Sequence, residues 1–82
     1  MPIASVVITL DARATLHDAA LAALRDDERV EVGNRVGARV PAVLETRTAD
    51  EGEALVREIA SVPGVLLVEL VGVDRSLDEG DA

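Results

Sequence analysis

Cysteine, lysine and all three aromatic residue types are absent from this 82-residue sequence. Without cysteine the chain has no disulfide, no thiolate metal ligand and no cysteine nucleophile. Without aromatic rings it lacks the stacking platforms on which RNA-recognition modules and single-strand binders rely. Val, Leu, Ile and Ala must therefore fill the core of one small domain.

The charge is strongly one-sided. Sixteen acidic residues face eight arginines, which gives a net charge of −8. A phosphate backbone would be repelled, so we expect no nucleic-acid partner. A basic peptide or a cationic protein surface is the better match for such a chain.

Long hydrophobic runs are also missing. No stretch without a charged side chain is longer than ten residues, and the stretch Ile59 to Val68 contains Pro63-Gly64. A membrane span needs about 20 apolar residues, and the N-terminus lacks the basic segment of a signal peptide. We therefore expect no membrane insertion and a cytoplasmic location.

Hydrophobic periodicity predicts four strands and two helices. Alternation of apolar residues indicates strands at 3–10, 30–32, 40–46 and 65–71. One helix is expected to begin after an N-cap at Thr15 and to end near Arg25, with Leu16, Ala19, Ala20, Ala23 and Leu24 facing the core. The second should begin at a capping box formed by Thr48 and Glu51 and stop before Pro63-Gly64.

The order β-α-β-β-α-β predicts an α+β, ferredoxin-like fold. Right-handed crossovers place both helices on one face of a four-stranded antiparallel sheet. We expect this domain to cover residues 1–73, and residues 74–82 to form an acidic mobile tail. Strict alternation would turn Leu66, Val68 and Leu70 toward the helices and Val65 away from them.

The sheet face away from the helices should be polar, yet the sequence places an apolar band there. The candidate peptide-binding residues on this open face are Val7, Val43 and Leu67, together with the carboxylates Glu31, Glu45 and Glu69. A ligand that is part apolar and part cationic fits such a surface. A homodimer with two sheets stacked face to face explains it equally well, and the sequence leaves both open.

No catalytic constellation is visible. His17 is expected to be an exposed polar residue, and no serine stands in a nucleophile context. The segment Gly33 to Gly37 lacks the Gly-Lys-Ser/Thr of a phosphate loop, and its glycines suit a hairpin. We therefore expect a binding module that is not an enzyme and that uses no cofactor or metal.

Several short segments together resemble the NapD family over nearly the whole chain. They are Ser5-Val6-Val7, Val30-Glu31-Val32, Val43-Leu44-Glu45-Thr46, Pro63-Gly64-Val65-Leu66 and Leu70-Val71. The family commonly has an aromatic residue and a histidine after the last Leu-Val, where this chain has Gly72-Val73. Pro41 also interrupts a strand that is usually rich in Val.

The resemblance implies a small cytoplasmic chaperone for the catalytic subunit of periplasmic nitrate reductase. Such chaperones bind the twin-arginine signal peptide and restrain export until the cofactor has been inserted. On this chain, Glu31, Glu45 and Glu69 would meet the arginines, and the edge strand 30–32 offers a second mode of pairing. The alternative is an ACT-like regulatory domain that binds a small molecule as a homodimer.

Overall fold

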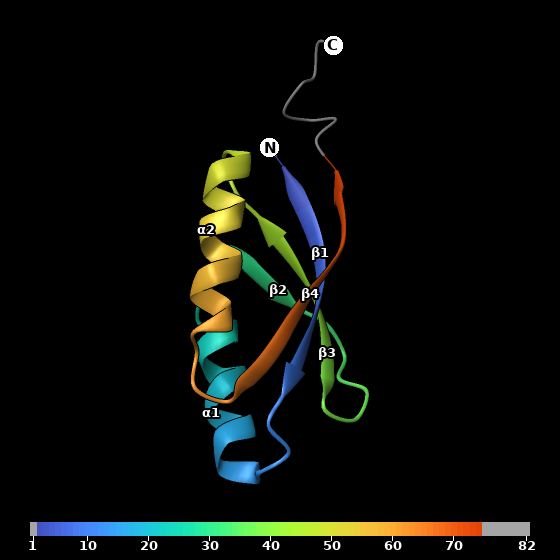
Figure 1. Cartoon of the computed structure of the whole chain (residues 1–82), viewed down its shortest axis with the longest axis vertical. Helices are drawn as coiled ribbons and strands as arrows, with labels where there is room; N and C mark the ends of the chain where they lie inside the picture. The colour runs from blue at the N-terminus through green and yellow to red at the C-terminus, as the bar shows by residue number, and fades with distance from the viewer. Residues whose placement is uncertain (1, 75–82) are drawn as a thin grey trace.

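The computed structural model describes residues 2–74. Four strands form one antiparallel sheet in the order β2-β3-β1-β4. Both helices pack on the same face of this sheet (Figure 1), which confirms the predicted ferredoxin-like α+β fold. The elements in chain order are β1 Ile3–Leu10, α1 Ala14–Arg25, β2 Val30–Val32, β3 Arg39–Glu45, α2 Ala49–Ala60 and β4 Val65–Asp74.

The core lies between the helices and the two central strands. Apolar residues on the helix side of β1 and β3 alternate with exposed or half-buried ones, as the sequence predicts. The most deeply buried apolar residues come from both central strands and both helices, and they are Val6, Ile8, Leu10, Val40, Ala42, Leu44, Ala20, Leu24, Leu55 and Ile59. Burial of these side chains supplies most of the driving force for folding.

The start of α1 differs from the sequence prediction. The helix begins at Ala14 with Arg13 at the N-cap and no capping side chain, so Thr15 is already inside the helix. Asp11 organises the turn instead, because its carboxylate accepts the Arg13 N–H at 2.9 Å and pairs with the guanidinium at 2.8 Å. These contacts with Arg13 lower the pKa of Asp11 to about 2.

The prediction that His17 is exposed is wrong. Its side chain is buried (5% exposed), and Nε2 lies 2.6 Å from Nη1 of Arg35 in the loop before β3. His17 stands three residues before Ala20 and seven before Leu24, so it shares their inward face of the helix. That face is rotated from the expected one, and Ala19 and Ala23 are exposed.

The helix α2 begins as predicted. The Thr48 side chain accepts the Glu51 N–H at 3.1 Å, which confirms the N-cap. The Glu51 carboxylate accepts the N–H of Arg47 at 2.7 Å, one residue before the cap. Leu55 and Ile59 are the buried residues of this helix.

The strand β4 departs from strict alternation because its register with β1 shifts twice. Val6 is opposite Leu70, but Ser5 is opposite Gly72, so Val71 is an extra residue. A second shift makes Leu66 extra and brings Val65 opposite Leu10, against the core. Val65 is therefore not on the open face, and Leu66 is exposed rather than buried, contrary to prediction. Leu70 does lie on the helix side, but it remains 59% exposed.

The predicted tail begins inside this strand. The structure pairs Asp74 with Ile3 at the end of β4. Residues 75–82 of the predicted tail lie outside the described residues. Within residues 2–74, neither helix is both long and apolar enough to cross a membrane.

Candidate functional site

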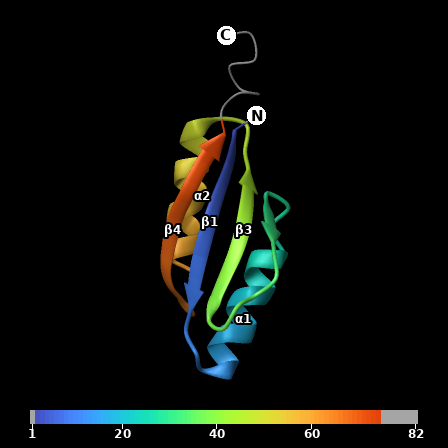
Figure 2. The same ribbon diagram turned by 90° about the vertical axis from the view of Figure 1, so that its right-hand side faces the viewer.

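The open sheet face carries the residues that the sequence suggests for peptide binding. Figure 2 shows this face toward the viewer, with the helices behind it. One row of register partners crosses all four strands, from Glu31 on β2 through Val43 and Ser5 to Gly72 on β4. The structure therefore places an acidic and an apolar side chain next to each other in one row.

An acidic hollow lies at the β2 end of this row. It encloses about 200 Å³, and Ile3, Glu28, Arg29, Glu31, Val43 and Glu45 line it. Glu31 and Glu45 are exposed diagonal neighbours on adjacent strands, since Glu31 is opposite Val43 and Glu45 is two residues farther along β3. Three carboxylates thus border one small hollow with a single guanidinium.

An apolar hollow adjoins the acidic one along Glu31 and Val43. It encloses about 320 Å³ and crosses β2, β3, β1 and β4. Its lining is mainly aliphatic and consists of Ser5, Val6, Val7, Glu31, Gly33, Pro41, Ala42, Val43 and Val71. Val7 and Val43, two of the predicted contact residues, therefore belong to one surface.

Glu69 and Leu67 are on the same face but apart from the acidic hollow. Glu69 is opposite Val7 on β4, and its carboxylate pairs with Arg39 at 2.9 Å. Leu67 is opposite Thr9, nearer the other end of the sheet. The structure thus joins four of the six predicted residues, Val7, Glu31, Val43 and Glu45, around the two hollows.

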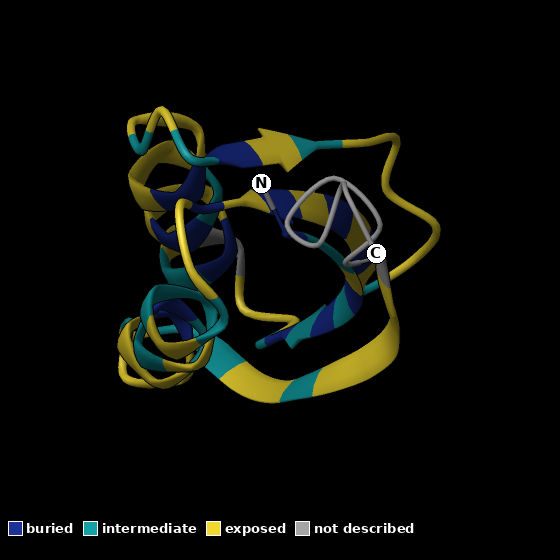
Figure 3. Ribbon diagram, turned by 90° about the horizontal axis from the view of Figure 1, so that it is seen from above, coloured by how far each residue is buried: buried dark blue, intermediate teal, exposed yellow. Residues whose placement is uncertain are grey.

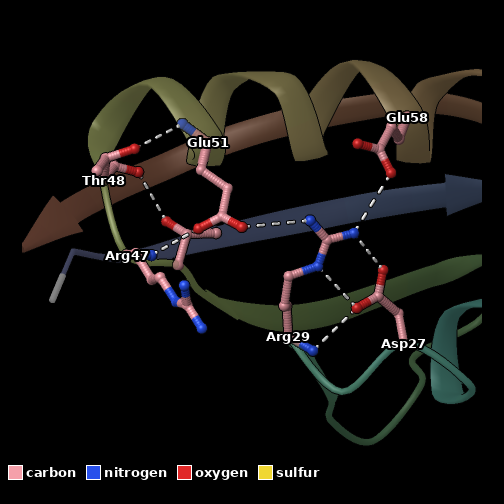
Figure 4. Close-up of polar contacts among 7 residues, drawn as sticks. Asp27, Arg29, Arg47, Thr48, Glu51 and Glu58 are labelled. Atoms are coloured by element: carbon pink, nitrogen blue, oxygen red, sulfur yellow. Dashed lines mark hydrogen bonds and ion pairs between the residues drawn. The ribbon is translucent and has the colours of Figure 1, made fainter.

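Arg29, which lines the acidic hollow, also binds three carboxylates that are not part of its lining (Figure 4). Its guanidinium makes a bidentate contact with Asp27, at 3.0 and 2.8 Å. It also reaches Glu58 at 3.3 Å and Glu51 at 3.7 Å, both on α2. The hydrogen bonds from Arg29 lower the pKa of Asp27. The contacts with Asp27 and Glu58 in turn raise the pKa of Arg29.

Pro41 explains why β2 is only three residues long. After Val32, the next pair in the register is Gly33 with Pro41, and the Gly33 N–H donates to the Pro41 carbonyl at 2.8 Å. Pro41 has no N–H to return that bond, so the ladder ends there. The chain then leaves the sheet and returns through a tight turn in which Gly37 has φ 62°, a conformation that favours glycine.

The chemistry of this face is recognition by charge and shape. Carboxylates bind guanidinium groups through two parallel hydrogen bonds, and an aliphatic hollow accepts an apolar segment. In residues 2–74, no three histidine, aspartate or glutamate side chains gather closely enough to hold a metal ion.

Sequence reasoning missed Glu28 as a member of this site. It stands in the acidic turn Asp26-Asp27-Glu28, which the sequence identifies only as the end of the first helix. The chain comparisons add no further residue. A comparison with protein families found no match for this chain, and a comparison with curated proteins found none either.

Proposed function

We propose that the open sheet face binds a peptide with adjacent arginines followed by an apolar segment. The observation that carries this proposal is the contact between the two hollows, one acidic and one aliphatic, along Glu31 and Val43. A twin-arginine signal peptide has both chemical features in that order, and it is the ligand that the resemblance to the NapD family implies. The chain would then act as a chaperone that restrains export of a cofactor-dependent enzyme.

The arginines are assigned to the acidic hollow because Glu31 and Glu45 have no cationic partner within the described residues. Two exposed carboxylates at diagonal sheet positions can each receive one guanidinium. Glu69 is the weaker candidate, since Arg39 already neutralises it. The apolar segment then lies over Val43, Val7 and Val71.

Calorimetric titration with a synthetic twin-arginine signal peptide tests the proposal. We expect saturable binding that weakens as salt increases, because part of the attraction is between partly exposed charges. A peptide with both arginines changed to lysine keeps the charge but loses the bidentate geometry, so it should bind less tightly. Equal affinity for the two peptides would contradict the carboxylate assignment, and no binding of either would contradict the function.

A further inference from the structure

The strand β4 is a long edge strand whose side chains are apolar and exposed. It has ten residues, and within residues 2–74 it pairs only with β1, at the end of the sheet order β2-β3-β1-β4. In Figure 3, this strand is mostly coloured as exposed, whereas dark blue buried residues recur along its neighbours. The exposed apolar residues along it are Leu66, Leu67, Leu70, Val71 and Val73. An edge of this kind is a template for pairing with another strand.

Among the described residues, no strand bonds the outer backbone groups of β4. The Leu10 N–H donates to the Ala38 carbonyl at 2.8 Å, so the backbone groups of Leu10 point toward β3. These groups alternate in direction along a strand, so those of Val7 point toward β4 and those of its register partner Glu69 point toward β1. The residues that flank that partner, Val68 and Leu70, therefore turn their N–H and C=O groups away from β1. These are the groups that an added strand would bond.

An apolar pocket opens beside the edge, between β4 and the first half of α2. It holds about 130 Å³, and its lining includes Val56, Leu70 and Val73. The pocket lies on the helix side of the sheet, where the core residues of the other strands are buried. An aliphatic side chain from a neighbouring strand would complete the packing that the chain itself leaves unfinished.

We propose that this edge is the interface of a homodimer, in which two copies of β4 pair antiparallel across a two-fold axis. The strand is self-complementary, because it has aliphatic residues on both faces and one charge, Glu69, between Val65 and Val73. That charge is neutralised by Arg39 of its own chain. A two-fold axis at Leu70 places Glu69 opposite Val71 of the second copy and avoids two opposed carboxylates.

An arginine-bearing peptide fits this edge poorly. The acidic hollow is at the β2 end of the sheet, and β3 and β1 separate it from β4. The contact is confined to one ten-residue strand on each copy, which places it among the small and weak protein interfaces. The dimer is therefore concentration-dependent, and it overlaps the proposed peptide site at Val71 alone.

Sedimentation velocity of the full chain over a range from about 10 µM to about 1 mM tests the dimer by mass action. We expect the mass to rise toward twice the 8.6 kDa of one chain. Leu70→Lys should weaken the dimer at least about tenfold by placing a charge at the interface. Val43→Lys, a matched control on the open face of β3, should leave dimerisation unchanged. A wild-type chain that stays monomeric, or a dimer broken only by Val43→Lys, would overturn the proposal.

Amide hydrogen exchange tests the same interface without a substitution. In the dimer, the Val68 and Leu70 amides should be protected, and dilution should remove that protection. The Leu67 and Glu69 amides, which face β1, should stay protected at every concentration. Rapid exchange of Val68 and Leu70 at concentrations where the mass is doubled would contradict edge pairing.

Discussion

The two edges of the sheet differ in length, charge and packing. The β2 edge has three residues, ends where Gly33 comes opposite Pro41 of β3, and is bordered by Glu28, Arg29 and Glu31. The β4 edge has ten residues, and Glu69 is the one charge between Val65 and Val73. Proline and charge protect the first edge against further pairing, while the second keeps the features that invite it. One sheet thus separates a surface for a cationic ligand from a surface for a second strand.

Truncating one leucine on the central strand β3 and one on the edge strand β4 should give the largest difference in the free energy of unfolding. Leu44 on β3 is 1% exposed and Leu70 on β4 is 59% exposed, although both lie on the helix side of the sheet. Leu44→Ala should lower the free energy of unfolding by about 2–5 kcal/mol, because it leaves a cavity. Leu70→Ala should cost less than about 1 kcal/mol in dilute, monomeric protein. Urea denaturation measures both values, and equal losses would show that β4 is packed as tightly as β3.

Carboxylate substitutions should separate the two regions in peptide binding. Glu31→Gln and Glu45→Gln should each weaken binding of a twin-arginine peptide roughly tenfold, or about 1.4 kcal/mol. Glu69→Gln, the control on β4, should change affinity little because Arg39 already occupies that carboxylate. Calorimetry at fixed salt gives the three ratios. A larger loss of peptide affinity for Glu69→Gln than for Glu31→Gln would contradict the assignment and place the arginine-binding site at β4.

Removing the guanidinium behind the acidic hollow should have a smaller effect on folding. Arg29 contacts Asp27, Glu51 and Glu58, and thereby links the segment before β2 to α2. Arg29→Gln should lower the midpoint of thermal denaturation, because it removes three partly exposed ion pairs at once. Arg39→Gln, which breaks one exposed pair, should lower it less. Thermal denaturation of both variants checks the order.

The smallest expected effect is the loss of stability when the pair of Asp27 and Arg29 is broken at acid pH. Since the pKa of folded Asp27 lies below its ordinary value of 3.8, the pair with Arg29 contributes stability above that value. The contribution is lost as pH falls through the lower folded pKa. The stability difference between the wild type and Asp27→Asn should therefore be constant near neutral pH and shrink as pH falls below 3.8. A difference that grows in acid would show that Asp27 does not titrate with a lowered pKa.

The sequence predicts the central strands well because their alternation is clear. In β1 and β3, apolar residues at every second position become the buried ones, and Thr48 caps its helix as its residue type suggests. The orientation of β4 cannot be predicted in this way. Its run Val65-Leu66-Leu67-Val68 is apolar at every position, so the pattern does not show which residues face the core. Its two register shifts could not be seen in such a pattern.

The site could be predicted only in part, because tertiary contacts complete it. Glu31, Glu45, Val7 and Val43 follow from alternation along their strands. Glu28 joins them through the path of the turn before β2, which no local pattern determines. His17 is buried by its helix face and by Arg35, which is 18 residues away in the sequence.

Backbone-amide chemical-shift mapping during titration with the twin-arginine peptide tests the central claim most directly. The account predicts that the shifted amides cluster at Glu31, Val43 and Val7, around the two hollows, while Val68 and Leu70 at the β4 edge do not respond to peptide. Dilution of the peptide-free protein should shift those edge amides and leave the amides of Glu31, Val43 and Val7 unchanged. Peptide-induced shifts confined to the helices or to β4 would contradict the proposed separation of the two surfaces.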